Sequence, residues 1–260
     1  MYEKWKGVHT RCAFNMIQEL IPLTRPRTLA AALGPTILGA AFSYYAFGAA
    51  QGTGLAIFHT VLIFLAVVTA QIVANLWNEY KDFKSGLDAG QKVGNAGSIT
   101  RGVITPELII TMIKILMFVP IIIGLYLSAT ITWYYIPVGF LCILISFLYS
   151  GGPKPISRTP FGEISSGIAM GFAIVLITGY AWIRELSLAL LIPAIPSTLL
   201  VGSIMLTNNI RDIRNDESHG RHTLPIVLGR ERALSLMSIS YIFNFIWIIA
   251  WIIVGHMTWF

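Results

Sequence analysis

Charged side chains are scarce in this protein. Asp, Glu, Lys and Arg make up 12% of its 260 residues, whereas 55% are hydrophobic. Soluble domains average about 25% charged residues. This composition argues against a single soluble globular domain.

Cysteine is nearly absent as well. The chain has 2 cysteines, Cys12 in a polar N-terminal stretch and Cys142 inside an apolar run. A disulfide between two such positions is not expected, and neither cysteine has a second Cys or a His at metal-ligand spacing. These observations exclude a disulfide scaffold and a cysteine-based metal centre.

Long apolar runs are what the chain has instead. Crossing a bilayer takes about 20 apolar residues in a helix, and lipid leaves no water to satisfy backbone amides outside helices or closed barrels. The runs lack the strict alternation of barrel strands. We therefore predict an all-α, multi-pass transmembrane bundle in one domain, residues 1–260, with residues 1–27 as a cytoplasmic or interfacial segment. The seven predicted spans are 28–48, 55–78, 106–128, 132–150, 161–183, 186–208 and 233–254.

The net charge of +6 comes from an uneven distribution of basic residues. Nearly all Lys and Arg precede the first run or lie in the connections after the second, fourth and sixth runs. Positive charge concentrates on the cytoplasmic side of membranes. The N-terminus and these connections are therefore predicted to be cytoplasmic in a cell-membrane protein, and no nucleic-acid partner is needed to explain the charge.

Acids and amides gather where the second and sixth runs leave the membrane. If the second helix continues to about residue 83, Asn75, Asn78, Glu79 and Asp82 share one face, and Asp88 can fold back after Gly86. The second cluster has a similar periodicity, because its members are four residues apart: Asn208, Asp212 and Asp216.

Such clusters predict a divalent cation. A helix C-terminus carries partial negative charge, so carboxylates placed there are destabilising unless positive charge lies between them. Magnesium binds through one or two carboxylates plus substrate phosphates. A metal site at the rim of a membrane bundle suits a substrate with a diphosphate head and an apolar tail.

Several basic residues are candidates for contact with that diphosphate. Lys154, Arg101, Arg214 and Arg25 all lie on the predicted cytoplasmic side. A role in membrane topology is the alternative for each of them. For Arg221 a role in topology is favoured, with substrate contact as the alternative.

Taken together, these motifs resemble those of UbiA-type intramembrane prenyltransferases. The paired clusters carry the resemblance. Three further motifs are similar to the branch that prenylates 1,4-dihydroxy-2-naphthoate in menaquinone synthesis: Ser150-Gly151-Gly152-Pro153-Lys154-Pro155, Thr159-Pro160-Phe161-Gly162-Glu163 and Gly220-Arg221-His222-Thr223-Leu224-Pro225. The family has nine transmembrane helices, and this chain has room for seven.

The resemblance implies Mg²⁺-dependent transfer of a polyprenyl group from its diphosphate to an aromatic acceptor. It implies catalytic roles for Asp82, Asp212 and Asp216. Glu79 stands where Asp is commoner, so an indirect metal contact is expected for it. The implied metal ligands are Asn78, Glu79, Asp82, Asp88, Asp212 and Asp216, and the implied diphosphate-binding residues are Asn75, Asn78, Asn208, Lys154, Arg101, Arg214 and Arg25.

Two alternatives remain open. Prenyl transfer could use another acceptor, namely 4-hydroxybenzoate, homogentisate, haem or an archaeal glycerol phosphate lipid. A transporter is the rival from another class, but it would place acids near mid-bilayer on broken helices, whereas both clusters here lie at the predicted rim.

Overall fold

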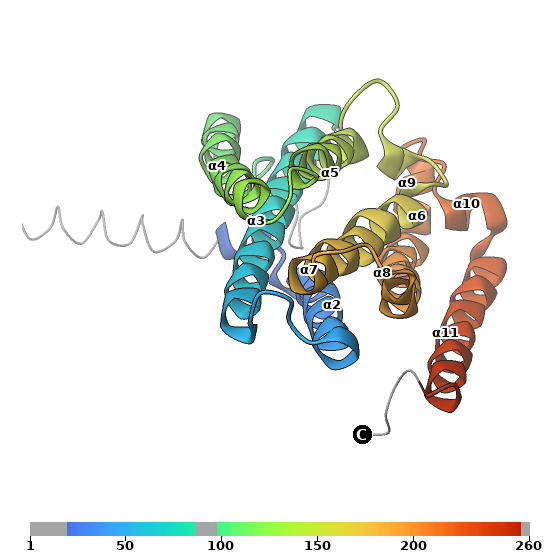
Figure 1. Ribbon diagram of the computed structural model, residues 1–260. Helices are drawn as coiled ribbons and strands as arrows, with labels where there is room; N and C mark the ends of the chain where they lie inside the picture. Colours follow the sequence, from blue (N-terminus) through green and yellow to red (C-terminus); the bar gives the residue numbers. More distant parts are fainter. Residues whose placement is uncertain (1–19, 87–97, 256–260) are drawn as a thin grey trace, which may run out of the picture.

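The computed structural model describes residues 20–86 and 98–255, which form a bundle of helices (Figure 1). Short 3₁₀ and π-helical segments join or interrupt the longer helices. The elements are η1 (Pro26–Leu29), α2 (Ala30–Phe47), α3 (Thr53–Ser85), α4 (Pro106–Thr130), α5 (Tyr135–Ser150), η2 (Ile156–Arg158), α6 (Gly162–Ser166), the π-helix η3 (Gly167–Phe172), α7 (Ala173–Ile183), η4 (Leu188–Leu190), α8 (Leu191–Arg211), α9 (Ile213–Ser218), α10 (Leu224–Leu228) and α11 (Arg230–Ile253).

Six helical segments in the described part of the chain are long and apolar enough to cross a membrane. They are α2, α3, α4, the continuous stretch Gly162–Ile183, the stretch Leu188–Arg211 and α11. The remaining predicted run forms α5, an apolar helix of 16 residues. At 1.5 Å per residue it is about 24 Å long, shorter than the roughly 30 Å hydrocarbon core. The predicted all-α membrane bundle is confirmed.

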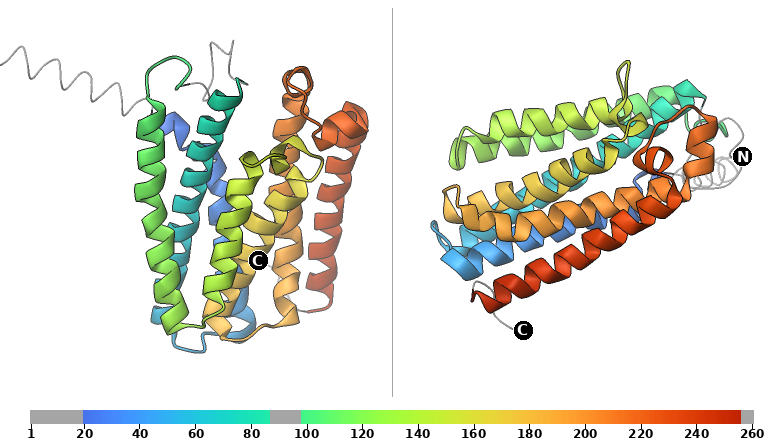
Figure 2. Two further views of the ribbon diagram at one scale, coloured as in Figure 1. Left: turned by 90° about the horizontal axis from the view of Figure 1, so that it is seen from above. Right: turned by 90° about the vertical axis from the view of Figure 1, so that its right-hand side faces the viewer.

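The long helices run side by side, so acidic stretches far apart in sequence meet at one end. The left view of Figure 2 shows the C-terminal ends of α3 and α8 at the same end of the bundle. In that view α11 stands at one edge and packs against α8. The fold thus brings the two polar clusters to a common rim.

Close helix contacts on one side of the bundle depend on small residues. A Cβ at Gly171 would lie 2.6 Å from the Cα of Thr198, and a Cβ at Gly39 would lie 2.8 Å from the carbonyl oxygen of Val175. The Ser197 hydroxyl donates a hydrogen bond to the Gly171 carbonyl at 3.2 Å. Small residues let membrane helices approach closely, so these contacts fix η3, α7, α8 and α2 against one another.

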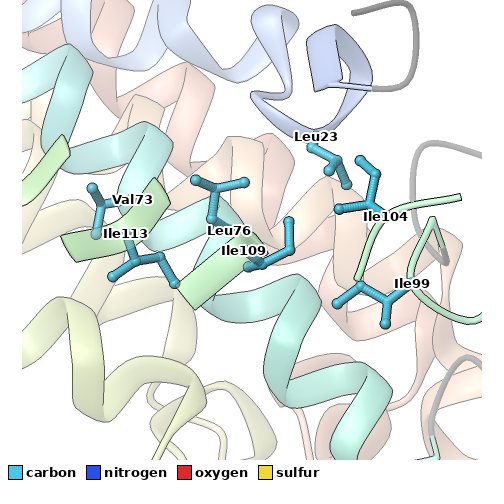
Figure 3. Close-up of a cluster of buried hydrophobic side chains, with 7 residues drawn as sticks. All are labelled: Leu23, Val73, Leu76, Ile99, Ile104, Ile109 and Ile113. Atoms are coloured by element: carbon cyan, nitrogen blue, oxygen red, sulfur yellow. The ribbon is translucent and has the colours of Figure 1, made fainter. Parts of the chain in front are cut away.

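A cluster of buried aliphatic side chains supports the rim at the end of α3 (Figure 3). It joins the segment before η1, α3, the 98–104 connection and α4. Asn75 adds a polar tie, because its Nδ2 donates to the Thr24 carbonyl at 2.9 Å. The cluster members are Leu23, Val73, Leu76, Ile99, Ile104, Ile109 and Ile113.

Candidate active site

A cavity of about 1050 Å³ lies between the helices. One end is apolar, lined by residues such as Ile63, Leu127 and Ile177, and the other is lined by both acidic clusters. Ile63 and Asp82 both lie on α3, 19 residues apart, which corresponds to about 28 Å along the helix. The cavity therefore joins a polar rim to a deep apolar interior.

The first cluster divides between the cavity and the protein interior. α3 continues to Ser85, as its predicted extension requires, and Asn75, Asn78 and Asp82 line the cavity. Asn78 accepts a hydrogen bond from the Ser150 hydroxyl through its Oδ1, which ties α3 to the end of α5.

Glu79 lies apart from the cavity. Its side chain is 2% exposed, and Oε1 accepts a hydrogen bond from the Ser98 backbone amide at 2.8 Å. At about 100° per residue, Glu79 is turned some 40° from Asn75, on the side away from Asn78. The four residues of the predicted face therefore spread over too wide an arc of the helix for Glu79 to point into the cavity with the other three. Asp88, which is also among the implied metal ligands, lies outside the described residues.

The second cluster lies opposite the first. Asn208, Asp212 and Asp216 all line the cavity, together with Asn209 and Asn215. The chain stays nearly helical through this stretch, since the Asp212 amide donates to the Asn208 carbonyl and the Asp216 amide donates to the Asp212 carbonyl. The predicted four-residue spacing therefore keeps the three side chains on one side.

Arg221 joins the two clusters directly. Its Nη2 lies 3.2 Å from Oδ1 of Asp82, and its Nη1 lies 3.3 Å from Oδ1 of Asp216. Gly220 adopts a left-handed conformation (φ 67°), and the Arg221 amide then donates to the Asp216 carbonyl at 3.0 Å, so the chain folds back over α9. The turn carries the guanidinium into the cavity, where the less favoured alternative, substrate contact, becomes possible for Arg221.

Of the four predicted diphosphate-binding cations, the structure places one in the cavity. Arg25 lines the polar end and has a left-handed backbone (φ 50°) just before η1. Lys154, Arg101 and Arg214 are exposed and are not among the described residues that line the cavity. A further arginine, Arg211, lines the rim and pairs with Asp212 at 2.8 Å; the Arg211 side chain is largely exposed and that of Asp212 partly exposed.

The donor chemistry of the polar end fits magnesium that arrives with a diphosphate. In the described parts of the chain, no three His, Cys, Asp or Glu side chains are grouped closely enough to hold a metal ion by themselves. Carboxylate and amide oxygens nevertheless line the rim on both sides. Magnesium typically takes only one or two carboxylates and completes its coordination with water and substrate phosphate, which this arrangement can provide.

Burial raises the pKa of Asp216 above its ordinary value. Removal from water is the largest cause, the nearby Arg221 opposes it, Asp212 adds to it, and His219 again opposes it. The carboxylate of Asp216 is therefore easier to protonate than that of an exposed aspartate.

A second group of polar residues lies beside the acidic rim, and of these sequence reasoning weighed only Tyr149, as an aromatic ring that could face the carbocation. Asn209 donates from Nδ2 to Oε1 of Glu163 at 2.8 Å. Asn209, Tyr149 and Ser166 line the cavity. Glu163 closes the Thr-Pro-Phe-Gly-Glu motif, which the sequence singled out without giving any of its residues a role.

The UbiA prenyltransferase family profile matches residues 32–260 of the chain. The chain belongs to the UbiA prenyltransferase family. It is 38% identical to the 1,4-dihydroxy-2-naphthoate octaprenyltransferase of Bacillus subtilis (strain 168), with 93% of this chain and 76% of that one aligned. The protein of the same name from Mycobacterium tuberculosis (strain H37Rv) is 31% identical, with 89% and 79% aligned.

Solved structures of the family share the fold. A digeranylgeranylglyceryl phosphate synthase superposes with a TM-score of 0.65 at 18% identity, covering 94% of this chain and 80% of that one. A UbiA homologue from Archaeoglobus fulgidus bound to GPP and Mg²⁺ also gives a TM-score of 0.65 at 18% identity, covering 88% and 76%. The resemblance found in the sequence motifs is confirmed, and the enzyme is a membrane prenyltransferase.

Proposed function

We propose that this single membrane domain transfers a polyprenyl group from polyprenyl diphosphate to 1,4-dihydroxy-2-naphthoate, with Mg²⁺ as cofactor. The observation that carries the proposal is the convergence of Asp82, Asp212 and Asp216, from two distant motifs, at the polar end of an apolar cavity. The naphthoate acceptor is supported by the names of the relatives from Bacillus subtilis and Mycobacterium tuberculosis. The prenyl donor and the metal are supported by the Archaeoglobus fulgidus homologue, whose structure holds GPP and Mg²⁺.

The two ends of the cavity suit the two parts of the donor. Asp82, Asp212 and Asp216 would hold the metal, with Asn78 beside them, and Arg25 and Arg221 offer guanidinium groups to the diphosphate oxygens. Bound magnesium neutralises the charge that develops on the leaving diphosphate. The prenyl chain would extend toward Ile63 among apolar side chains, which keep water from the allylic carbon as its bond to oxygen breaks.

The aromatic acceptor is expected to bind in the cavity beside the diphosphate end. The acceptor's ring carbon must reach the allylic carbon while the diphosphate is still held at the rim. The hydroxyl-bearing residues Tyr149, Ser165 and Ser166 line that region, next to Asn209. Polar side chains without net charge there suit an aromatic ring that carries hydroxyl groups.

The active site is proposed to face the cytoplasm in the cell membrane. The ends of α3 and α8 share one end of the bundle (Figure 2), and the basic residues cluster in the connections at that end. Single cysteines placed at exposed Lys154 and at exposed Leu186, in a background with Cys12 and Cys142 replaced by Ser, can be labelled from outside intact cells. Labelling at Leu186 and protection at Lys154 are expected, and the reverse pattern would refute the orientation.

A transfer assay tests the reaction itself. Purified enzyme receives a labelled polyprenyl diphosphate with 1,4-dihydroxy-2-naphthoate, or with 4-hydroxybenzoate or homogentisate, in the presence of Mg²⁺ or EDTA. Product is expected only with 1,4-dihydroxy-2-naphthoate as acceptor, and only when Mg²⁺ is present. Asp82→Asn should lose the activity, whereas Glu217→Gln, an exposed acid beside Asp216 that does not line the cavity, should keep it. Preference for another acceptor would refute the naphthoate assignment, and equal activity in EDTA would refute the metal.

A further inference from the structure

The carboxylate of Glu163 is buried without a cationic partner in the described part of the chain. The residue is 4% exposed, and its recorded side-chain partner is Asn209. Its second oxygen, Oε2, is buried and has no hydrogen-bond partner among the described residues. Buried carboxylates are costly unless they are paired or hydrogen-bonded, so an acid retained here calls for an explanation.

Asn209 is the residue through which Glu163 can act on the cavity. Its Nδ2 donates to Oε1 of Glu163 at 2.8 Å, and a carboxylate can only accept, so this contact fixes which way the amide points. Asn209 lines the cavity. With the nitrogen engaged, Oδ1 is the polar atom that Asn209 can offer to a ligand.

The position of Asn209 differs from that of the neighbouring diphosphate residues. It follows Asn208 directly, so it is turned by about 100° around α8, toward α6. Tyr149 and Ser166 also line the cavity. The start of α6 is packed firmly on α8, because a Cβ at Gly202 would lie 3.2 Å from the Glu163 carbonyl oxygen. The Glu163–Asn209 pair is thus held between two helices in fixed contact.

We propose that Glu163 is a positioning residue that aims the Asn209 amide oxygen at a phenolic hydroxyl of the aromatic acceptor. The inference rests on the proposed function and assigns the acceptor's side of the site. An amide oxygen backed by a carboxylate repels phosphate oxygens and accepts hydrogen bonds, so it suits a hydroxyl donor and not the diphosphate. The hydrogen bond would orient the ring beside the diphosphate end of the cavity.

Four variants separate this role from a structural one: Glu163→Gln, Glu163→Leu, Asn209→Leu and the double variant Glu163→Leu/Asn209→Leu. Glu163→Gln keeps an oxygen that can accept from Asn209 but can also donate to it, so it should raise the acceptor KM less than Glu163→Leu does. Glu163→Leu removes the anchor and should raise the acceptor KM about 10-fold, the scale of one lost hydrogen bond to a charged group. The KM for prenyl diphosphate and the Mg²⁺ concentration for half-maximal activity should stay unchanged. In Glu163→Leu/Asn209→Leu both polar partners are gone, which avoids leaving a buried group unpaired.

The double variant provides the decisive comparison. If Glu163 acts through Asn209, the double variant should be no worse for acceptor KM than Asn209→Leu alone. Direct binding gives a second readout, measured without prenyl diphosphate or metal. Wild-type enzyme should bind 1,4-dihydroxy-2-naphthoate more tightly than 2-naphthoate, which lacks the hydroxyls, and Glu163→Leu should lose that preference.

Three results would overturn the proposal. The first is an equal effect of Glu163→Leu on the acceptor KM in the wild-type and the Asn209→Leu backgrounds. The second is a folded Glu163→Leu enzyme that still prefers 1,4-dihydroxy-2-naphthoate to 2-naphthoate. The third is a shift confined to the KM for prenyl diphosphate or to the Mg²⁺ requirement. The last would assign the pair to the metal and diphosphate. A wild-type enzyme that prenylates no aromatic acceptor would instead refute the proposed function, so the two failures are distinguishable.

Discussion

Replacing Arg221 by Gln should destabilise the metal-free enzyme more than the metal-bound one. Arg221 lies between Asp82 and Asp216, at 3.2 and 3.3 Å. The side chains of Arg221, Asp82 and Asp216 are 15%, 22% and 4% exposed, so solvent screens the interaction only in part. Without the guanidinium, two carboxylates from different motifs are left facing each other.

The size of the effect follows from burial and distance. Breaking a fully buried ion pair costs about 3–5 kcal/mol, but both contacts here are longer than the roughly 2.7–2.9 Å of strong charge-assisted hydrogen bonds. A loss of about 2 kcal/mol is therefore expected. For a chain of this size it corresponds to a fall in melting temperature of roughly 4–8 °C.

The assay is thermal unfolding of purified enzyme in EDTA, and again in saturating Mg²⁺ without pyrophosphate, which Arg221 itself is proposed to bind. In EDTA the full fall in melting temperature is expected for Arg221→Gln. In Mg²⁺ the difference from wild type should shrink, because the proposed metal would supply positive charge between the same carboxylates.

Arg211→Gln is the matched control. Arg211 pairs with Asp212 at a shorter distance, 2.8 Å, but the two side chains are 70% and 43% exposed. Such surface pairs contribute about 0–1 kcal/mol, so burial and not distance should decide the ranking. A larger fall for Arg211→Gln, or the same fall for Arg221→Gln in both buffers, would refute the reasoning.

Three further outcomes are expected. Asp212→Ala should lower kcat at least about 100-fold, as loss of transition-state charge stabilisation does. A near-wild-type melting temperature would show that the variant still folds. Substantial Mg²⁺-dependent turnover would contradict the proposed metal-binding role of Asp212. The pKa of Asp216 is raised, so lowering the pH through that pKa should increase the Mg²⁺ needed for half-maximal activity, because protons compete with the metal for the carboxylate. The same change in pH should stabilise the metal-free protein, because folding favours the protonated acid. A Mg²⁺ requirement that does not change with pH would be evidence against this. Gly171→Ala should lower the free energy of unfolding by about 1–3 kcal/mol through overpacking, measured as a fall in melting temperature. Gly34→Ala is the control, because nothing lies near a Cβ at that position, and it should cause no such fall. Equal effects of the two variants would show that the contact at Gly171 is not tight.

Local patterns determined most of the secondary structure and part of the site. Seven apolar runs predict helices because each must satisfy its own backbone in lipid, and all seven are helical. The four-residue spacing of Asn208, Asp212 and Asp216 predicts a shared face because helix geometry is a property of the local chain. Family membership followed from the same motifs, since they are short and contiguous.

Tertiary structure decided which of those residues meet. Glu79 fits the helical spacing of its cluster, but its carboxylate accepts a hydrogen bond from the Ser98 backbone amide, in another segment of the chain. Arg221 resembles any cytoplasmic arginine in sequence, yet the turn at Gly220 brings it to Asp82, 139 residues away. Glu163 and Asn209 pair only because α6 packs on α8. Periodicity in one segment predicts which of its side chains share a face of the helix. Contacts between segments depend on how the helices are placed against each other, and no single segment contains that information.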